Sequence, residues 1–309
     1  MTHDLQTVSQ TLCVHTARFT VVELADYIDW LYFFHAWGFP PKCGELAHIH
    51  NCMGCRQAWI ASWPAQQQEK AREAIRLFED ACEMLRQLEA DGYGATARIA
   101  LSSANSEGDD ILLADGRRIP LLRQQQPTAE GLCFCLSDFV RPAAHGIPDR
   151  IGIFVSCTDH AVEQLYSEDG YRHLLAQTLA DRMAEACIEQ AHEYTRRSWW
   201  GYAPHEHLSK RQLFAGKFQG IRPAVGYPSL PDQSLNFILD GIVDFSRAGV
   251  TLTENGAMKP HASTSGLMIA HPQAQHFSVG QIGEDQFADY ARRRAMEPAA
   301  LRRFFRHIQ

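Results

Sequence analysis

Apolar residues recur at helical spacing along two long stretches of the chain. Within residues 65–88 they fall on one stripe, and the opposite face carries mostly charged side chains. Residues 174–199 show the same spacing over a longer stretch. We therefore predict the two longest helices here. Their buried sides are predicted to hold Ala71, Ile75, Phe78, Cys82 and Leu85 in the first, and Leu175, Leu179, Met183, Ala186 and Tyr194 in the second.

Shorter apolar segments predict further helices. Residues 23–37 are rich in apolar and aromatic side chains, and Gly38 with the Pro40-Pro41 pair would end a helix there. A helix is also predicted around residues 235–245, and two more are predicted to close the chain.

Between the helices the pattern becomes typical of strands. Residues 96–101 predict one strand, and residues 111–122 predict a β-hairpin because Asp115-Gly116 suits a type I′ turn. Further strand candidates are 132–136, 151–155, 267–270 and 276–279. With no internal repeat and no linker in the sequence, we predict a single α+β domain over residues 1–309. Its sheet should be mainly antiparallel and flanked by helices.

Composition narrows the class of protein. The formal net charge of −7 disfavours nucleic acid as a partner, since no basic run offsets it. No apolar run is long enough to cross a bilayer, so no membrane association is expected. Met1–Gln10 lacks the pattern of a secretion signal, which predicts a cytoplasmic protein. The nine cysteines are scattered and are expected to be mostly reduced.

Three segments are unusual for a scaffold. Gly220–Pro231 holds two glycines and three prolines, and predicts an irregular loop whose backbone groups are free to bind a ligand. Arg222 could contact a carboxylate, or could simply form a salt bridge within a structural loop. Trp199–Pro204 is an aromatic cluster that fits either a core or the wall of a nucleoside pocket. Leu252–Gly266 is rich in small residues and fits either a tight loop or a close approach of backbone or ligand.

The first of these segments carries a specific resemblance. Gly220-Ile-Arg-Pro-Ala-Val-Gly-Tyr-Pro228 resembles the Arg-Pro-Ala-x-Gly-Tyr-Pro signature of the activation domain of cobalamin-dependent methionine synthases. Similar motifs appear in the same order over about residues 23–309. They are Tyr27-Ile-Asp-Trp30, Gly108-Asp-Asp-Ile111, Asp138-Phe-Val140, Asp181-Arg-Met-Ala-Glu-Ala186, Trp200-Gly-Tyr-Ala-Pro204, Leu252-Thr-Glu254, Ser265-Gly266, His271-Pro272 and Asp289-Tyr-Ala-Arg-Arg293.

The resemblance implies a C-shaped α+β unit that binds S-adenosylmethionine (AdoMet) near this loop. In the family, AdoMet then methylates reduced cobalamin held by another module, and flavodoxin is the electron donor in some bacteria. The implied AdoMet-binding residues are Asp29, Glu185, Arg222, Ala224, Gly226, Tyr227, His276 and Phe277. From the residues alone, Asp29 would be a helix-surface acid and Glu185 a solvated partner of Arg182. No catalytic acid or base is predicted, because this methyl transfer needs none.

The sequence departs from the family at two points. Pro231-Asp-Gln-Ser-Leu-Asn236 lacks the family's His, Glu and Lys, and His276 stands where the family has tyrosine. The chain also has no Asp-x-His-x-x-Gly cobalamin motif. We therefore expect a methyltransferase subunit that acts on a cobalamin-bearing partner in trans. A non-catalytic AdoMet sensor or assembly partner is the alternative, and a metal-dependent hydrolase using His205-Glu-His207 is a third, weaker hypothesis.

Residues 40–60 look like an insertion relative to the family. The segment contains zinc-ligand residue types, including Cys52-x-x-Cys55, but a second CxxC is missing. Two interpretations remain open. The cysteines are either reduced and structural, or part of a zinc site formed by Cys43, His48, Cys52 and Cys55, with His50 nearby.

Overall fold

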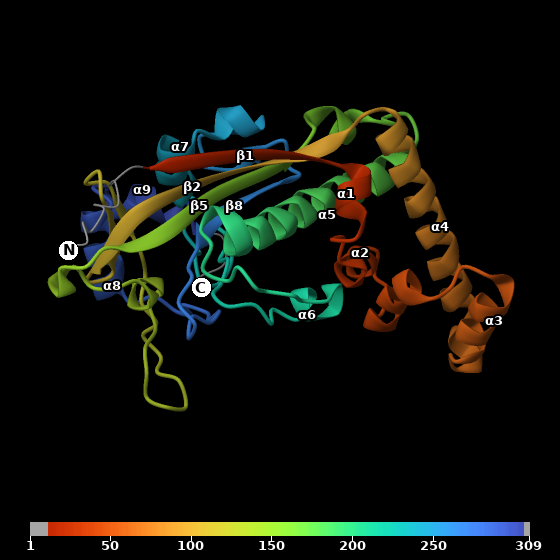
Figure 1. Cartoon of the computed structure of the whole chain (residues 1–309), viewed down its shortest axis with the longest axis horizontal. Helices are drawn as coiled ribbons and strands as arrows, with labels where there is room; N and C mark the ends of the chain where they lie inside the picture. The colour runs from red at the N-terminus through yellow and green to blue at the C-terminus, as the bar shows by residue number, and fades with distance from the viewer. Residues whose placement is uncertain (1–11, 306–309) are drawn as a thin grey trace, which may run out of the picture.

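The computed structural model describes residues 12–305, so the segment Met1–Gln10 lies outside the described residues. Its centre is a curled antiparallel sheet built on the long strand β2 (Figure 1). One edge of β2 pairs with β5, which in turn pairs with β8. The other edge is shared by β1 and the β3–β4 hairpin. The strands are β1 (Cys13–Thr20), β2 (Gly94–Glu107), β3 (Asp110–Leu113), β4 (Arg118–Pro120), β5 (Asp149–Thr158) and β8 (Ser263–Met268).

Helices cover both faces of this sheet. Successive side chains of a strand point to opposite faces, and here both faces carry apolar side chains that must be buried. On β5, Phe154 packs among the helices α1, α2, α4 and α5, whereas Ile153 and Val155 pack on the opposite face with α7. The helices are α1 (Val21–Ala25), α2 (Trp30–Ala36), α3 (Met53–Ala61), α4 (Gln68–Ala90), α5 (Gly170–Tyr194), α6 (Lys210–Phe214), α7 (Leu235–Val243), α8 (Glu284–Arg293) and α9 (Pro298–Arg302).

The remaining elements are short. A second sheet consists of β6 (Thr251–Leu252) and β7 (Met258–Lys259) alone. Short 3-10 helices include η1 (Pro41–His48), which precedes α3, and η7 (Phe245–Ala248) after α7. A π-helical turn at Thr195–Trp199 ends α5. Across residues 12–305, every helix is too short or too polar to span a lipid bilayer.

The predicted α+β class with an antiparallel sheet is confirmed, as are the two long helices. Three predictions at residue level are wrong. Residues 23–37 form two helices, because Asp29 caps the second of them. Tyr194 is exposed instead of buried. The hairpin at Asp115-Gly116 forms, but only Gly116 has a positive φ, as expected of a type I turn followed by a glycine bulge.

Two predicted strands are extended loops. In 132–136, the amide of Phe134 donates to the side chain of Gln124, so no ladder continues. In 276–279, the amide of Phe277 donates to the Ser229 hydroxyl and that of Val279 to the Pro228 carbonyl. In both segments the backbone amides therefore bond to groups of irregular loops, and not to the backbone of a neighbouring strand.

Candidate functional site

A groove of about 860 Å³ lies between α5, the start of α2, the α6 segment and the loop after Gly220. Its walls combine acidic, basic and aromatic side chains. The size suits a ligand as large as a nucleoside with an attached amino acid. The lining includes Tyr27, Asp29, Tyr32, Phe154, Arg182, Glu185, Glu189, Phe214, Phe218, Arg222, Pro223, Ala224, Tyr227, Pro228, Thr264, His276 and Phe277.

The loop after Gly220 is an irregular extension of the sheet. Ile221 exchanges two backbone hydrogen bonds with Ile269 (2.8 and 3.0 Å), and the amide of Val225 donates to the Ser265 carbonyl (2.9 Å). The expectation that this backbone is unused is therefore wrong for its first half. In an extended segment alternate residues direct their amide groups to opposite edges, so those of Arg222 and Ala224 point away from β8.

Gly266 permits this close approach. A Cβ atom on it would lie 2.2 Å from the Pro223 carbonyl oxygen and 2.8 Å from the Ala224 Cα. The residue must therefore be glycine for the loop to lie on β8. Of the two interpretations of Leu252–Gly266, close approach of another backbone is the one that the structure shows at this position.

One face of α5 supplies charged groups to the groove. Arg182, Glu185 and Glu189 line it at helical spacing, although most of α5 is buried. Glu189 forms an ion pair with Arg222 (2.7 Å), and Arg222 also donates to Nδ1 of His192 (3.3 Å). Burial, and then the positive charge of Arg222, lower the pKa of His192 well below its usual value, so the ring stays neutral and accepts this bond.

The Arg222–Glu189 pair matches the salt-bridge interpretation of Arg222. The guanidinium has five N–H donors, however, and these two contacts leave others for a ligand carboxylate. A binding role for Arg222 is therefore compatible with its internal ion pair.

Two carboxyl groups give the groove negative potential. Burial raises the pKa of Glu185, and the positive charges of Arg222 and Arg182 oppose that rise. Burial likewise raises the pKa of Asp29, while the Leu31 amide, which donates to its carboxylate (2.9 Å), opposes it. Burial therefore disfavours the ionised form of each carboxyl group, so each would gain from a cationic ligand.

Aromatic rings form the outer walls. Tyr32 and Tyr227 are 57% and 58% exposed, and Phe277 also lines the groove. Burial, with Arg222 nearby, lowers the pKa of His276, which favours a neutral ring at this position. The groove thus places aromatic rings beside the charged side chains of α5 and Arg222, which suits a ligand with an aromatic ring joined to a charged chain.

The structure brings together all the predicted site residues except Gly226. Gly226 does not line the groove; its φ of +88° and the bond from its amide to the Leu230 carbonyl form the turn that leads into Tyr227. Sequence reasoning missed Tyr27, Tyr32, Arg182 and Glu189 as lining residues. The spacing of the charged residues 182, 185 and 189, which places them on one face of the predicted helix, was the signal for two of them.

The wall that contains α6 is anchored by a buried ion pair. Glu206 accepts hydrogen bonds from Nε and Nη2 of Arg196 (2.6–3.0 Å), and their side chains are 9% and 0% exposed. The Arg196 guanidinium stacks on Phe218, a groove residue, at 4.3 Å. Glu206 therefore has a structural role, which replaces the hydrolase hypothesis for His205-Glu-His207, whereas His205 and His207 are exposed loop residues.

The aromatic cluster at Trp199–Pro204 stands beside the groove without lining it. Trp199 stacks on His15 with ring centroids 4.8 Å apart, and Trp200 meets Tyr202 edge-on. Of the two interpretations, packing against the core is the one observed.

The segment after Pro231, in which the sequence departs from the family pattern, takes part in a buried network. Asp232 accepts a hydrogen bond from the Tyr290 hydroxyl (2.7 Å), and Asn236 bonds to Ser265 and to the Gly256 carbonyl. None of residues 231–236 lines the groove. Asp232, which fits the family pattern, therefore joins this segment to α8, and Asn236, which departs from it, joins the segment to β8.

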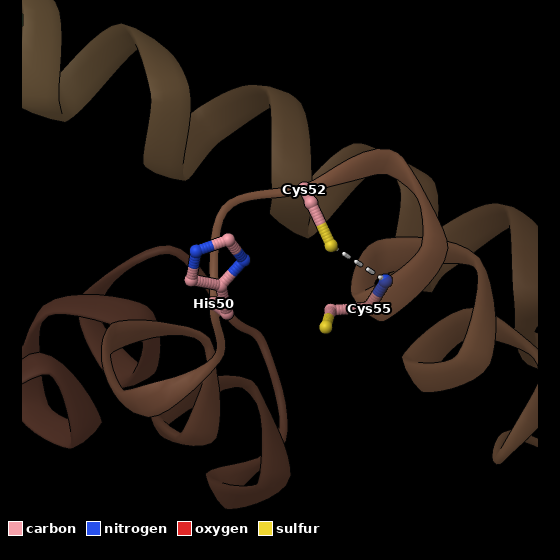
Figure 2. A group of neighbouring side chains, drawn as sticks. All are labelled: His50, Cys52 and Cys55. Atoms are coloured by element: carbon pink, nitrogen blue, oxygen red, sulfur yellow. Dashed lines mark hydrogen bonds between the residues drawn. The ribbon is translucent and has the colours of Figure 1, made fainter.

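The cysteines of residues 40–60 separate into two groups. Cys43 is fully buried in the core, and burial raises its pKa to about 11. His50, Cys52 and Cys55 converge at the start of α3, with their ligand atoms within 4.8 Å of one another (Figure 2). Cys43 and His48 are not in this group, so the ligand set predicted from the sequence is corrected. All nine cysteines lie in the described region, and none forms a disulfide.

Comparisons with known proteins agree with this geometry. A sequence model of the family described as vitamin B12 dependent methionine synthase, activation domain, matches residues 20–295. The crystal structure of the MetH reactivation domain bound to AdoHcy is similar to this chain, with a TM-score of 0.82 and 33% sequence identity. The similarity covers 95% of this chain and 89% of that chain. The likeness therefore extends over nearly the whole fold.

Proposed function

Because the chain belongs to the family of vitamin B12 dependent methionine synthase activation domains, we propose that its groove binds AdoMet for the reductive remethylation of cobalamin. The observation that carries the proposal is the groove itself. It brings Arg222, Glu185 and Asp29 together beside aromatic walls, and the similar MetH domain is bound to AdoHcy.

The charges of the groove are complementary to those of AdoMet. Arg222 would bind the carboxylate, and Glu185 and Asp29 would face the ammonium and sulfonium groups. Tyr227, His276 and Phe277 would enclose the adenine and ribose, while Ala224 would supply backbone contacts and the turn at Gly226 would position Tyr227. Burial of the two acids before the ligand arrives makes them ready acceptors for its positive charge.

The partner in this proposal is a cobalamin-bearing methionine synthase or corrinoid protein acting in trans in the cytoplasm. The partner's cobalamin would supply the methyl acceptor once a reductant such as flavodoxin had donated one electron to its cob(II)alamin form, and AdoMet would leave as AdoHcy. The residues of this chain contribute binding and orientation, which place the methyl group toward the partner. Zinc has no part in this step.

Replacing Arg222 by alanine should weaken AdoMet binding by at least about 1.5 kcal/mol, as for hydrogen bonds to a charged group. Isothermal titration calorimetry measures this. Arg222→Lys is the companion variant, since it keeps the charge beside Glu189 but loses the forked geometry. Arg86→Ala, on the exposed face of α4, is the control. Unchanged affinity in both Arg222 variants would contradict the proposed role.

Replacing Glu185 by glutamine should stabilise the protein while weakening AdoMet binding. The raised pKa means that the folded state favours the neutral carboxyl, so at pH values above that pKa the ionised group lowers stability. Glutamine removes this cost, and the gain in melting temperature should shrink as the pH is lowered through the pKa of Glu185. Wild-type affinity for AdoMet should fall over the same pH range, whereas the variant should bind about tenfold more weakly with a flatter pH profile.

Incubation with a cobalamin-loaded partner and a reductant tests the whole proposal. AdoMet-dependent formation of methylcobalamin, followed by its absorption spectrum, is the expected result. Tight AdoMet binding without methyl transfer would instead support the sensor hypothesis. Residues 231–236 lie outside the groove, so their differences from the family do not bear on AdoMet binding, which both hypotheses share.

A further inference from the structure

A second cluster of chemically active side chains lies on the lobe formed by η1, α3 and the start of α4. His50 and Cys52 are exposed and Cys55 is half-buried, so core packing does not explain their presence. None of the residues that line the groove belongs to this lobe. In Figure 1 the lobe projects beyond the end of the sheet. The cluster is therefore separate from the proposed AdoMet site.

The backbone holds the three side chains in place. The amide of Cys52 donates to the His50 carbonyl (2.9 Å), which closes a three-residue turn and directs His50 toward the helix. Cys52 is the N-cap of α3, and the amide of Cys55 donates to its sulfur (3.4 Å; Figure 2). The Cys-x-x-Cys spacing thus places both sulfur atoms at the same end of one helix.

The charges around the cluster also suit a cation. The nearest basic side chain in the sequence is Arg56, which is paired with Glu79 of α4 and bonded to Asn51. Its positive charge is thereby compensated. Two thiolates and an imidazole would bring the site to neutrality with one divalent ion, which lowers the cost of placing the ion there.

We propose that His50, Cys52 and Cys55 bind one zinc ion, with the fourth coordination position open to water or a small external ligand. Thiolate and imidazole are the ligands that zinc prefers in proteins, and tetrahedral zinc needs its ligand atoms roughly 3.3–3.8 Å apart. The observed separations, all within 4.8 Å, require only small side-chain rotations. The bound ion would join the turn after η1 to the first turn of α3.

Metal titration of the reduced protein, without a histidine tag, tests the proposal. We expect one equivalent of zinc, measured by competition with a chromophoric chelator. Cobalt(II) should give the intense visible absorption of tetrahedral thiolate coordination. Cys52→Ser, Cys55→Ser and His50→Gln should each weaken zinc binding by more than about tenfold, since even outer-shell changes cost that much. Cys13→Ser is a matched control, because this exposed thiol lies 3.3 Å from His15 but has no second thiol. His48→Gln is a second control.

The proposal would be overturned if the wild-type protein did not bind zinc. It would also be overturned if the three ligand variants bound zinc as strongly as the wild type does. If the reduced protein failed to bind zinc and oxidation produced a Cys52–Cys55 disulfide, the two cysteines would be a redox pair instead. AdoMet calorimetry on the same samples separates this proposal from the previous one. Groove affinity should not depend on zinc, so either proposal can fail alone.

Discussion

Replacing Glu206 by alanine is expected to lower the free energy of unfolding by roughly 3–5 kcal/mol, the usual cost of removing one partner from a buried ion pair. Arg196 is fully buried, and its guanidinium would lose its only counterion among the described residues. Urea denaturation measures the change. Because Arg196 also stacks on Phe218, the wall of the groove should loosen and AdoMet affinity should fall as well.

Two further variants identify the cause. Glu83→Gln breaks a highly exposed pair with Arg86 and should change stability by less than about 1 kcal/mol. The double variant Arg196→Met, Glu206→Leu removes both charges and should recover much of the loss, since apolar residues of similar volume can replace a buried pair. A double variant as unstable as Glu206→Ala would show that shape, and not charge, makes the pair essential.

Replacing Gly266 by alanine should detach the AdoMet loop from the sheet. The added Cβ would lie 2.2 Å from the Pro223 oxygen and 2.9 Å from a ring carbon of Phe154, so either the loop or β8 must move. Overpacking of this kind costs roughly 1–3 kcal/mol, and the backbone bonds of Ile221 and Val225 would be strained in addition. We expect at least about a tenfold loss of AdoMet affinity by calorimetry together with a lower melting temperature.

Gly241→Ala is the matched control. Gly241 lies within α7, and an added Cβ there would meet no atom within 4 Å. Alanine should therefore stabilise the helix by roughly 0.5–1 kcal/mol and leave AdoMet binding intact. If Gly266→Ala bound AdoMet as well as this control does, the loop would not depend on its contact with β8.

Local patterns in the sequence predicted the helices well. Residues 65–88 and 174–199 repeat apolar side chains with the period of a helix, and tertiary packing agrees with that period. The break within 23–37 was also readable, because Asp29 followed by an apolar run is a typical N-cap. The extended loops at 132–136 and 276–279 were not, since apolar alternation alone does not reveal which partner takes the backbone hydrogen bonds.

The site depended on the resemblance and on contacts distant in sequence. The residues alone favoured solvated positions for Asp29 and Glu185; the resemblance predicted them as binding residues, and the fold brings both to the groove. The Arg222–Glu189 pair joins a loop to a helix 33 residues earlier, a contact that no local pattern encodes. In the same way, the sequence offered five candidate metal ligands, and only the structure separates the buried Cys43 from the cluster at α3.

The pairing of residues 221–225 with β8 has a consequence for solubility. Without that segment, β8 would present an open edge of unpaired amides and carbonyls, on which a second chain could add a strand and begin to aggregate. The segment proposed to bind AdoMet thus also pairs with the edge strand β8 and shields it from other chains. A ligand that holds it in place would therefore protect the protein from self-association.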